Sequence, residues 1–488
     1  MTGSPSPSPD ITEASGYPNS SSPPEKKGID DNMPSDKSRD DAEGELTYPE
    51  GGWKAYSVVL GSFLSIAACF GMTNSLGALE AQLAAAALKD YSRDHIGWIF
   101  GVYAFISFFG GIQIGPMFDA YGPRWLMVSG SVTLISGVIL FSVSTKYWHF
   151  MLTLGILCGV GTSLLFTPSV AAIGHWSLRR RGELTGIAAT GGSIGGIVFP
   201  LLIQHTAPKM GFGWSLRIVG FVMIPLCAGG ILLVRGRTEI FHSLTPRVPL
   251  SEASPISEKS SASSQTEVNP RPERRKAFGG AKIDLTAFKD PRFALTTIGV
   301  FMIEWGIFIP LTYLTSHAIS IGISQTLSYQ LLAILNAGSV FGRWFPGLLA
   351  DRMGRFNTMI LTTLFCSLTV FGFWLSSGYA ESHEARKALL IVFALCYGFG
   401  SGTGIGLTPV CVGQICSTQD YGKRYGTCYF IVSFGALTGI PIAGAILSVD
   451  NGQYFGLIMF CGATYIAALG FFVAARIVGA GWRLKTIY

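Results

Sequence analysis

Long apolar stretches dominate the chain from residue 56 onward. A helix needs about 20 predominantly apolar residues to cross the hydrocarbon core of a bilayer, and hydropathy identifies such segments. The pattern predicts twelve spans in two sets of six, at residues 56–79, 96–117, 125–144, 150–174, 184–204, 214–234, 293–317, 327–350, 358–376, 388–413, 427–448 and 454–475. We therefore expect an all-α membrane protein with twelve transmembrane helices in two six-helix halves.

Polar segments separate and flank these halves. They are rich in Ser, Pro and charge, and such composition cannot bury a core or cross a membrane. An even number of spans puts both termini on one side, and basic clusters at that side predict that it is cytosolic. The expected organisation is a disordered cytosolic tail at 1–50, a first half at 51–234, a cytosolic linker at 235–292, a second half at 293–475 and a cytosolic tail at 476–488.

The composition of the chain excludes several classes of protein function. Charged residues are 13% of the chain and aromatic residues 12%, which excludes a water-soluble globule. The net charge of +6 comes from short basic clusters between apolar runs, so we expect no nucleic-acid partner. The nine cysteines form no CxxC pair, and the chain has no phosphate-cradling GxxxxGK[ST] motif. No metal site, cofactor, ATP-driven pump or enzyme is expected.

A loop motif occurs once in each half. GPMFDAYGPR at 115–124 follows the second span, and GLLADRMGR at 347–355 follows the eighth. Glycine permits a tight turn, aspartate can face a helix N-terminus, and arginine can pair with a carboxylate. An ordinary turn in a basic loop is the alternative, but repetition at equivalent places favours a gate. The candidate gating residues are Asp119, Arg124, Asp351 and Arg355.

These two motifs resemble the loop signature of the major facilitator superfamily, and the resemblance extends from about residue 48 to residue 482. YPEGGWKAY at 48–56 and HWSLRRRGELTGIAATGGSIGG at 175–196 are similar to signatures of its monocarboxylate porter branch. The resemblance implies a carrier with the major facilitator fold, commonly proton-coupled. Its fungal-type members take substrates well beyond monocarboxylates.

The chain departs from that branch at two positions. Monocarboxylate carriers place a lysine in helix 1, and an aspartate four residues before an arginine in helix 8, to bind the substrate carboxylate and the proton. The corresponding residues here are Asn74 and Ser339, and Arg343 alone fits the pattern. Loss of both a cation and an anion leaves a viable but more neutral cavity, so a simple lactate-type symporter is not expected.

Small residues recur through the fifth span, and such spacing allows close approach between membrane helices. We expect packing to be their main role. They are Gly186, Thr190, Gly191, Ser193, Gly195 and Gly196.

Ionisable residues deep in a span are candidate functional residues, because a charge inside the bilayer costs free energy. Glu304 lies eleven residues into the seventh span, about 16 Å along the helix and near the bilayer midplane. It is the candidate proton carrier. The alternative is a structural carboxylate paired with a polar neighbour such as a Tyr hydroxyl.

Other polar residues within apolar spans either line a binding site or tie helices together. Trp305, Phe308 and Tyr313 are candidates for stacking on a planar ligand, and Gln330 and Gln414 are further polar positions. Glu80 and His205 lie near the outer ends of their spans and are expected at the mouth. The predicted solute-binding set is Asn74, Gln113, Glu304, Asn336 and Arg343.

Together these features predict a secondary active transporter that moves a small organic solute by alternating access. The solute is monocarboxylate-like, vitamin-like or a secondary metabolite, and protons and the lipid bilayer are the other expected partners. A nutrient sensor built on the carrier fold, and an exporter in place of an importer, remain alternatives. A multi-pass plasma-membrane protein is expected, with a vacuolar or other organelle membrane as the alternative.

Overall fold

The computed structural model describes residues 51–177, 180–236, 284–416 and 421–482. All regular secondary structure in these ranges is helical. Most of the predicted tails and linker lies outside the described residues, so their boundaries stay predictions.

Helices of the first half follow one another through short connections. A long first helix is divided into α2 and α3, the second into α4 and α5, and the fourth contains a π-helical stretch, η1. Their bounds are α2 Trp53–Thr73, α3 Leu76–Ala85, α4 Arg93–Phe109, α5 Gly111–Tyr121, α6 Pro123–Phe141, α7 Tyr147–Phe150, η1 Met151–Cys158, α8 Gly159–Gly174, α9 Arg181–Met210 and α10 Phe212–Leu233.

The second half opens with a short 3₁₀ turn, η2. Asp290 then caps α12, because its side chain accepts a hydrogen bond from the backbone N–H of Arg292 at 2.9 Å and Pro291 fits the first helical turn. The bounds are η2 Leu285–Lys289, α12 Pro291–Ser320, α13 Gln325–Met353, α14 Arg355–Thr369, η3 Val370–Leu375, α15 His383–Gln414, α16 Tyr421–Val449 and α17 Phe455–Ala480.

Eleven helical segments in the described part of the chain are long and apolar enough to cross a membrane. The remaining predicted span, the eighth at 327–350, corresponds to α13, which has 29 residues but a less apolar composition that includes Arg343 and Arg352. Its length still suits a span, because a helix rises about 1.5 Å per residue. The all-helical prediction is confirmed.

One glycine forms the turn in each repeated loop motif. Gly122 (φ 76°) lies between α5 and α6, and Gly354 (φ 95°) lies between α13 and α14. A positive φ is strained for residues with a side chain, so glycine suits both turns. The two motifs therefore share their backbone conformation as well as their sequence.

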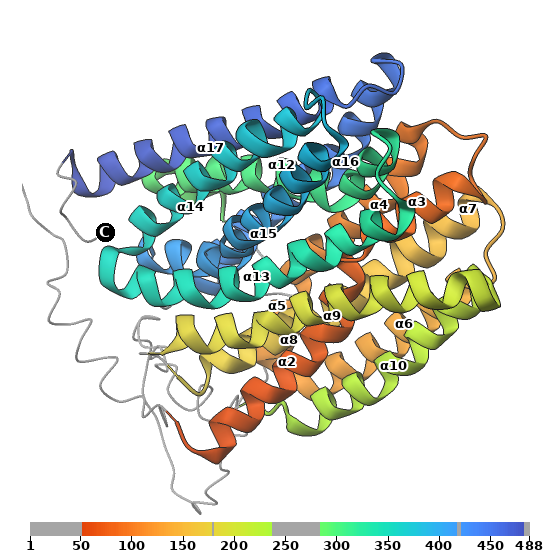
Figure 1. Cartoon of the computed structure of the whole chain (residues 1–488). Coiled ribbons are helices and arrows are strands. Elements are labelled where there is room, and N and C mark those ends of the chain that lie inside the picture. Colours follow the sequence, from red (N-terminus) through yellow and green to blue (C-terminus); the bar gives the residue numbers. More distant parts are fainter. Residues whose placement is uncertain (1–50, 178–179, 237–283, 417–420, 483–488) are drawn as a thin grey trace, which may run out of the picture. The chain divides into compact units, whose positions relative to one another are not determined.

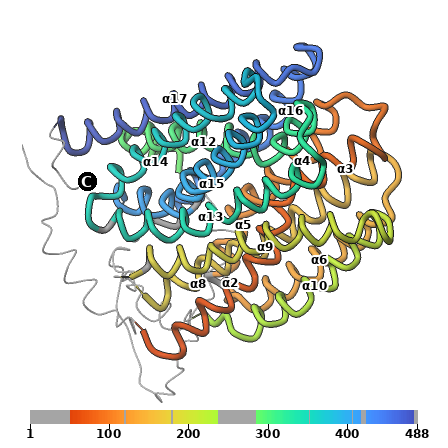
Figure 2. Tube along the Cα trace, in the orientation of Figure 1, coloured from red at the N-terminus to blue at the C-terminus, as the bar shows by residue number. Residues whose placement is uncertain are grey.

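The two halves meet mainly along two pairs of helices, with smaller contacts such as that between α3 and α12. In Figure 1 the first half, coloured red to yellow-green, lies below the second half, coloured green to blue. The contacts run between α9 and α13 and between α4 and α16, and Figure 2 shows the same pairing of chain segments. We call the side where α2 begins and α17 ends the termini side, at the left in Figure 1, and the other the opposite side.

Candidate functional site

A central pocket lies where the two halves meet. Its walls come from α2, α12, α13 and α15, so both halves contribute. The lining residues are Phe70, Thr73, Asn74, Ile307, Phe308, Leu311, Leu335, Asn336, Ser339, Arg343, Ser401 and Gly402.

Asn74 reaches this pocket because the first helix breaks beside it. The backbone N–H of Ser75 bonds to the carbonyl of Met72, three residues back, and the hydroxyl of Ser75 bonds to the carbonyl of Gly71. These bonds end α2 at Thr73 before α3 starts at Leu76. The sequence pattern predicts one continuous span at 56–79, because local side-chain bonds that end a helix leave hydropathy unchanged.

Two asparagine side chains are fixed by the backbone of α9. Asn74 Nδ2 donates to the carbonyl of Gly192 at 2.9 Å, and Asn336 Nδ2 donates to the carbonyls of Gly196 at 3.2 Å and Leu332 at 2.9 Å. A reversed amide would set its oxygen against these carbonyls, so the contacts also fix the amide orientation. Neither Oδ1 accepts a hydrogen bond from the described residues.

Arg343 is buried in the wall of the same pocket. Its Nε donates to Ser339 Oγ at 3.2 Å and its Nη1 donates to the carbonyl of Ala189 at 2.6 Å. Within the described ranges, no carboxylate forms an ion pair with it, although the residue is only 5% exposed. An unpaired buried charge is costly, so this guanidinium is ready to receive an anion or a strong acceptor.

Two glycines of α9 create the space that these side chains occupy. A Cβ atom at Gly192 would lie 2.7 Å from Phe70 Cβ and 2.9 Å from Arg343 Nη1. At Gly196 it would lie 2.5 Å from Asn336 Oδ1 and 2.6 Å from Asn74 Cβ. The glycines therefore bring the polar residues of both halves against one face of α9.

Other small residues of α9 serve helix packing, as predicted. Gly191 lies against the carbonyl of Phe63, and Gly195 lies against the backbone of Ala67 and Gly71. This face contacts α2, so the fifth span has a packing face and a separate pocket face.

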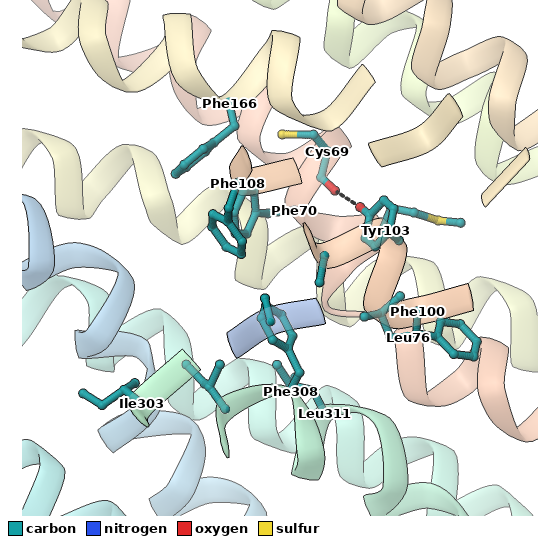
Figure 3. Packing of buried hydrophobic residues seen from close by; sticks show 14 of the residues in the cluster. Cys69, Phe70, Leu76, Phe100, Tyr103, Phe108, Phe166, Ile303, Phe308 and Leu311 are labelled. Atoms are coloured by element: carbon teal, nitrogen blue, oxygen red, sulfur yellow. Dashed lines mark hydrogen bonds between the residues drawn. The ribbon is translucent and has the colours of Figure 1, made fainter. Parts of the chain in front are cut away.

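Aromatic rings form a continuous row beside the pocket (Figure 3). Phe70 lies 4.5 Å from Phe166 and 6.2 Å from Phe108 between ring centroids, and Phe108 lies 6.2 Å from Phe308. The row runs from the first half to α12 in the second. Of the three predicted stacking residues, only Phe308 lines the pocket, while the hydroxyl of Tyr313 donates to the carbonyl of Ile440 at 3.2 Å.

Glu304 lies one turn before Phe308 on α12, outside the pocket lining. It is 2% exposed, and its Oε2 has no hydrogen-bond partner among the described residues. The predicted alternative, a carboxylate held by a polar neighbour, is thus not observed for this oxygen. A carboxyl group without a partner is unusual in a protein interior and is typical of functional positions.

On the opposite side, a buried carboxylate joins the two halves. Glu80 of α3 is 1% exposed; it pairs with Arg93 of α4 and accepts a hydrogen bond from Ser316 of α12. Close by, Gly77 packs against the backbone carbonyl of Leu311, and Gly101 packs against that of Leu437. These contacts join the two halves on the opposite side, so Glu80, which was expected near the mouth, lies in a contact between the halves.

A second pocket of about 330 Å³ lies toward the termini side and shares Arg343 with the first. Its walls come from α9, α13 and α15. The lining residues are Gly182, Gly342, Arg343, Pro346, Gly347, Ala350, Thr403, Gly406, Leu407 and Val410.

The remaining predicted polar residues lie away from the central pocket. Gln113 is half-buried in α5, Gln330 is exposed on α13, and Gln414 is half-buried at the end of α15. His205 is exposed and lies 2.9 Å from Lys209. Hydropathy cannot tell which face of a helix points into a cavity, so it could not separate these residues from Asn74 and Asn336.

The candidate gating residues lie in the repeated loops, as their motif requires. Arg124 is exposed at the start of α6, and Arg355 is half-buried at the start of α14. The side chains of Asp119 and Asp351 lie outside the described residues, so the gating role stays a prediction.

Comparison with known proteins identifies the family. Residues 58–385 match the model of the Major Facilitator Superfamily. The chain is 37% identical over 458 residues to the riboflavin transporter MCH5 of Saccharomyces cerevisiae, covering 92% of this chain and 83% of that protein. It is 30% identical over 437 residues to the fujikurins efflux protein of Gibberella fujikuroi, covering 89% and 85% of the two chains.

A solved structure supports the fold. A mutant of the nucleoside transporter NupG aligns with a TM-score of 0.62 over 86% of this chain and 99% of that one, at 14% sequence identity. The chain belongs to the major facilitator superfamily. It is a multi-pass membrane transporter of small solutes and not an enzyme.

Proposed function

We propose that this protein is a secondary carrier that binds one small organic solute in the central pocket and moves it by alternating access between the two halves. The observation that carries the proposal is Arg343, a buried cation with no ion-pair partner among the described residues, bordering a pocket shared by both halves. A carrier needs such a site, because both halves must sense the solute to couple binding to movement.

Arg343 is the residue that holds an anionic or strongly accepting group of the solute. Asn74 and Asn336 border the same pocket and complete the polar part of the site. Ser339 replaces the aspartate of the monocarboxylate pattern and supplies a neutral acceptor to the guanidinium at 3.2 Å. The arginine therefore keeps its full charge for the solute.

For energy coupling we propose that Glu304 carries the proton. Its support is the buried carboxyl group with an unpartnered oxygen, one turn from the pocket residue Phe308. A carboxyl group that gains and loses a proton once per cycle would link solute movement to a proton gradient.

The direction of transport, into or out of the cell, depends on the gradients and not on the fold. Relatives include a protein named as a riboflavin transporter and one named as an efflux protein. We propose that a compound in the classes their names represent, a vitamin or a secondary metabolite, is the physiological solute. Transport should therefore be measured in proteoliposomes with the solute supplied on either side of the membrane.

A transport assay tests the proposal. Purified protein in proteoliposomes is screened for uptake of radiolabelled organic acids, vitamins and metabolites, with and without a pH gradient. Arg343→Ala should abolish transport of the identified anionic solute, while Arg217→Ala serves as a matched control on α10, where the arginine lies 4.7 Å from the ring of Trp214. Equal loss in the two variants, or none in either, would contradict the proposed site.

A further inference from the structure

Two hydrogen-bond acceptors border the central pocket without a donor. Asn74 and Asn336 are 4% and 1% exposed. Each commits its Nδ2 to a carbonyl of α9, and neither Oδ1 accepts a hydrogen bond from the described residues. Neither oxygen is among the fully enclosed side-chain atoms that lack a partner, and each keeps free capacity to accept a hydrogen bond.

A third polar group beside the pocket has the opposite character. The guanidinium of Arg343 uses Nε and Nη1 for Ser339 and Ala189, and its Nη2 donates to none of the described residues. The pocket therefore offers cationic donors at one place and neutral acceptors at another.

The positions of these groups are fixed relative to each other by α9. Arg343 lies against Gly192, whose carbonyl also holds the amide of Asn74, and Asn336 lies against Gly196, one helical turn further along. One turn of an α-helix rises about 5.4 Å. This spacing is comparable to the width of a six-membered ring with its substituents.

Two aromatic rings belong to the apolar wall of the pocket, beside the aliphatic side chains of Ile307, Leu311 and Leu335. Phe70 of α2 and Phe308 of α12 both line it, and Phe108 connects the two rings at 6.2 Å from each. Aromatic faces pack well against another ring, and this preference adds to the burial of apolar area.

From this arrangement we infer the class of solute: a flat, ring-containing compound that presents an acidic or strongly accepting group to Arg343 and O–H or N–H donors to the oxygens of Asn74 and Asn336. This inference rests on the proposed function, because it assumes that the central pocket is the solute site. It goes further by excluding aliphatic acids and aromatic acids without donors as good substrates.

A panel of simple probes separates the three requirements. Cyclohexanecarboxylate supplies the anion on a puckered saturated ring, benzoate makes the ring flat and aromatic, and 3-hydroxybenzoate and 3,5-dihydroxybenzoate add donors. Binding of each is measured by calorimetric titration of the full-length protein in nanodiscs. We expect donors to improve affinity about 3- to 10-fold over benzoate, the range of one net hydrogen bond.

Substitutions test whether the higher affinity of the hydroxylated probes comes from the amides of Asn74 and Asn336. Asn74→Leu and Asn336→Leu keep the branched shape of the side chain without its polar atoms. We expect each variant to bind the hydroxylated probes and benzoate with nearly equal affinity. Asn336→Ser is the second choice at that position if the leucine variant does not fold. Gln330→Leu, an exposed change on the same helix, is the matched control and should preserve the wild-type ratios.

The outcomes distinguish a wrong solute class from a wrong binding site. If all four probes bind equally and all need Arg343, the pocket is the site but the inferred class is wrong. An undiminished advantage of the hydroxylated probes in both asparagine variants would also overturn the inference. If no probe binds, or if binding persists in Arg343→Ala, the proposed site fails with it.

Discussion

Arg343 of α13 donates a 2.6 Å hydrogen bond to the backbone carbonyl of Ala189 on α9. The bond joins the second half to the first through a side chain that also borders the central pocket. We propose that a bound anion would compete for the same guanidinium, so that solute binding would change a contact between the halves. This competition is the simplest link between occupancy of the pocket and movement of the halves.

Replacing the guanidinium with an ammonium tests that link. Arg343→Lys keeps the charge but loses the planar set of donors that can serve Ser339, Ala189 and a solute together. We expect affinity for an anionic solute to fall about 10- to 100-fold, the range of one charge-assisted hydrogen bond. Calorimetric titration measures it, and unchanged affinity would show that the solute does not use this side chain.

The glycines of α9 should matter through the residues they position. In Gly196→Ala the new methyl group would lie 2.5 Å from Asn336 Oδ1 and 2.6 Å from Asn74 Cβ, so both side chains must shift. Overpacking of this kind costs about 1–3 kcal/mol. We expect weaker solute binding with normal membrane insertion.

A second glycine substitution supplies the control. Gly470 lies in α17, where a Cβ atom has no neighbour within 4 Å, so Gly470→Ala should leave solute affinity unchanged. If the two variants bind solute equally well, the position of the asparagines is not set by Gly196.

Glu304→Gln tests proton coupling. Glutamine retains the size of the side chain and cannot exchange a proton, so solute exchange should continue while the response to a pH gradient is lost. Counterflow and gradient-driven uptake, measured in the same proteoliposomes, separate the two activities. Full gradient-driven accumulation by the variant would assign coupling to another residue.

The contact on the opposite side predicts a different phenotype. Glu80→Gln removes the partner charge of Arg93 while keeping a side chain that can still bond to Ser316. Loss of this ion pair should raise the equilibrium constant for opening of the opposite side about 3- to 10-fold. Labelling of Leu311→Cys by an impermeant thiol reagent from that side should accelerate in the Glu80→Gln background, whereas equal rates would show that Glu80 does not hold the halves together.

Much of the fold was predictable because membrane helices are defined by length and apolar composition. The structure confirms the helical class and the glycine turns at Gly122 and Gly354, where a repeated motif needs a positive φ. The break at Asn74 was not predictable, because it depends on hydrogen bonds to the neighbouring turn rather than on hydropathy.

The site was predictable only in part. Asn74, Asn336 and Arg343 were identified as polar residues in apolar helices, and all three border one pocket. Their partners on α9 were missed, since Ala189, Gly192 and Gly196 contribute backbone carbonyls, which no side-chain pattern reveals. The glycines of α9 were the available signal. The sequence alone could not tell whether they make room for the pocket residues or serve helix packing.

Protection of a pocket cysteine by the transported solute tests the central claim most directly. Ser401 lines the central pocket, and among the described residues its hydroxyl bonds only to the carbonyl of Gly398 on its own helix. Ser401→Cys should therefore leave the binding groups intact. Ser448→Cys on α16, outside the pocket, is the control, and the wild-type chain gives the labelling background. At a solute concentration ten times the Kd, labelling of Ser401→Cys should slow about tenfold, in proportion to the free fraction, while Ser448→Cys is unaffected. An unchanged labelling rate at Ser401→Cys during active transport would contradict the assignment of this pocket as the solute site.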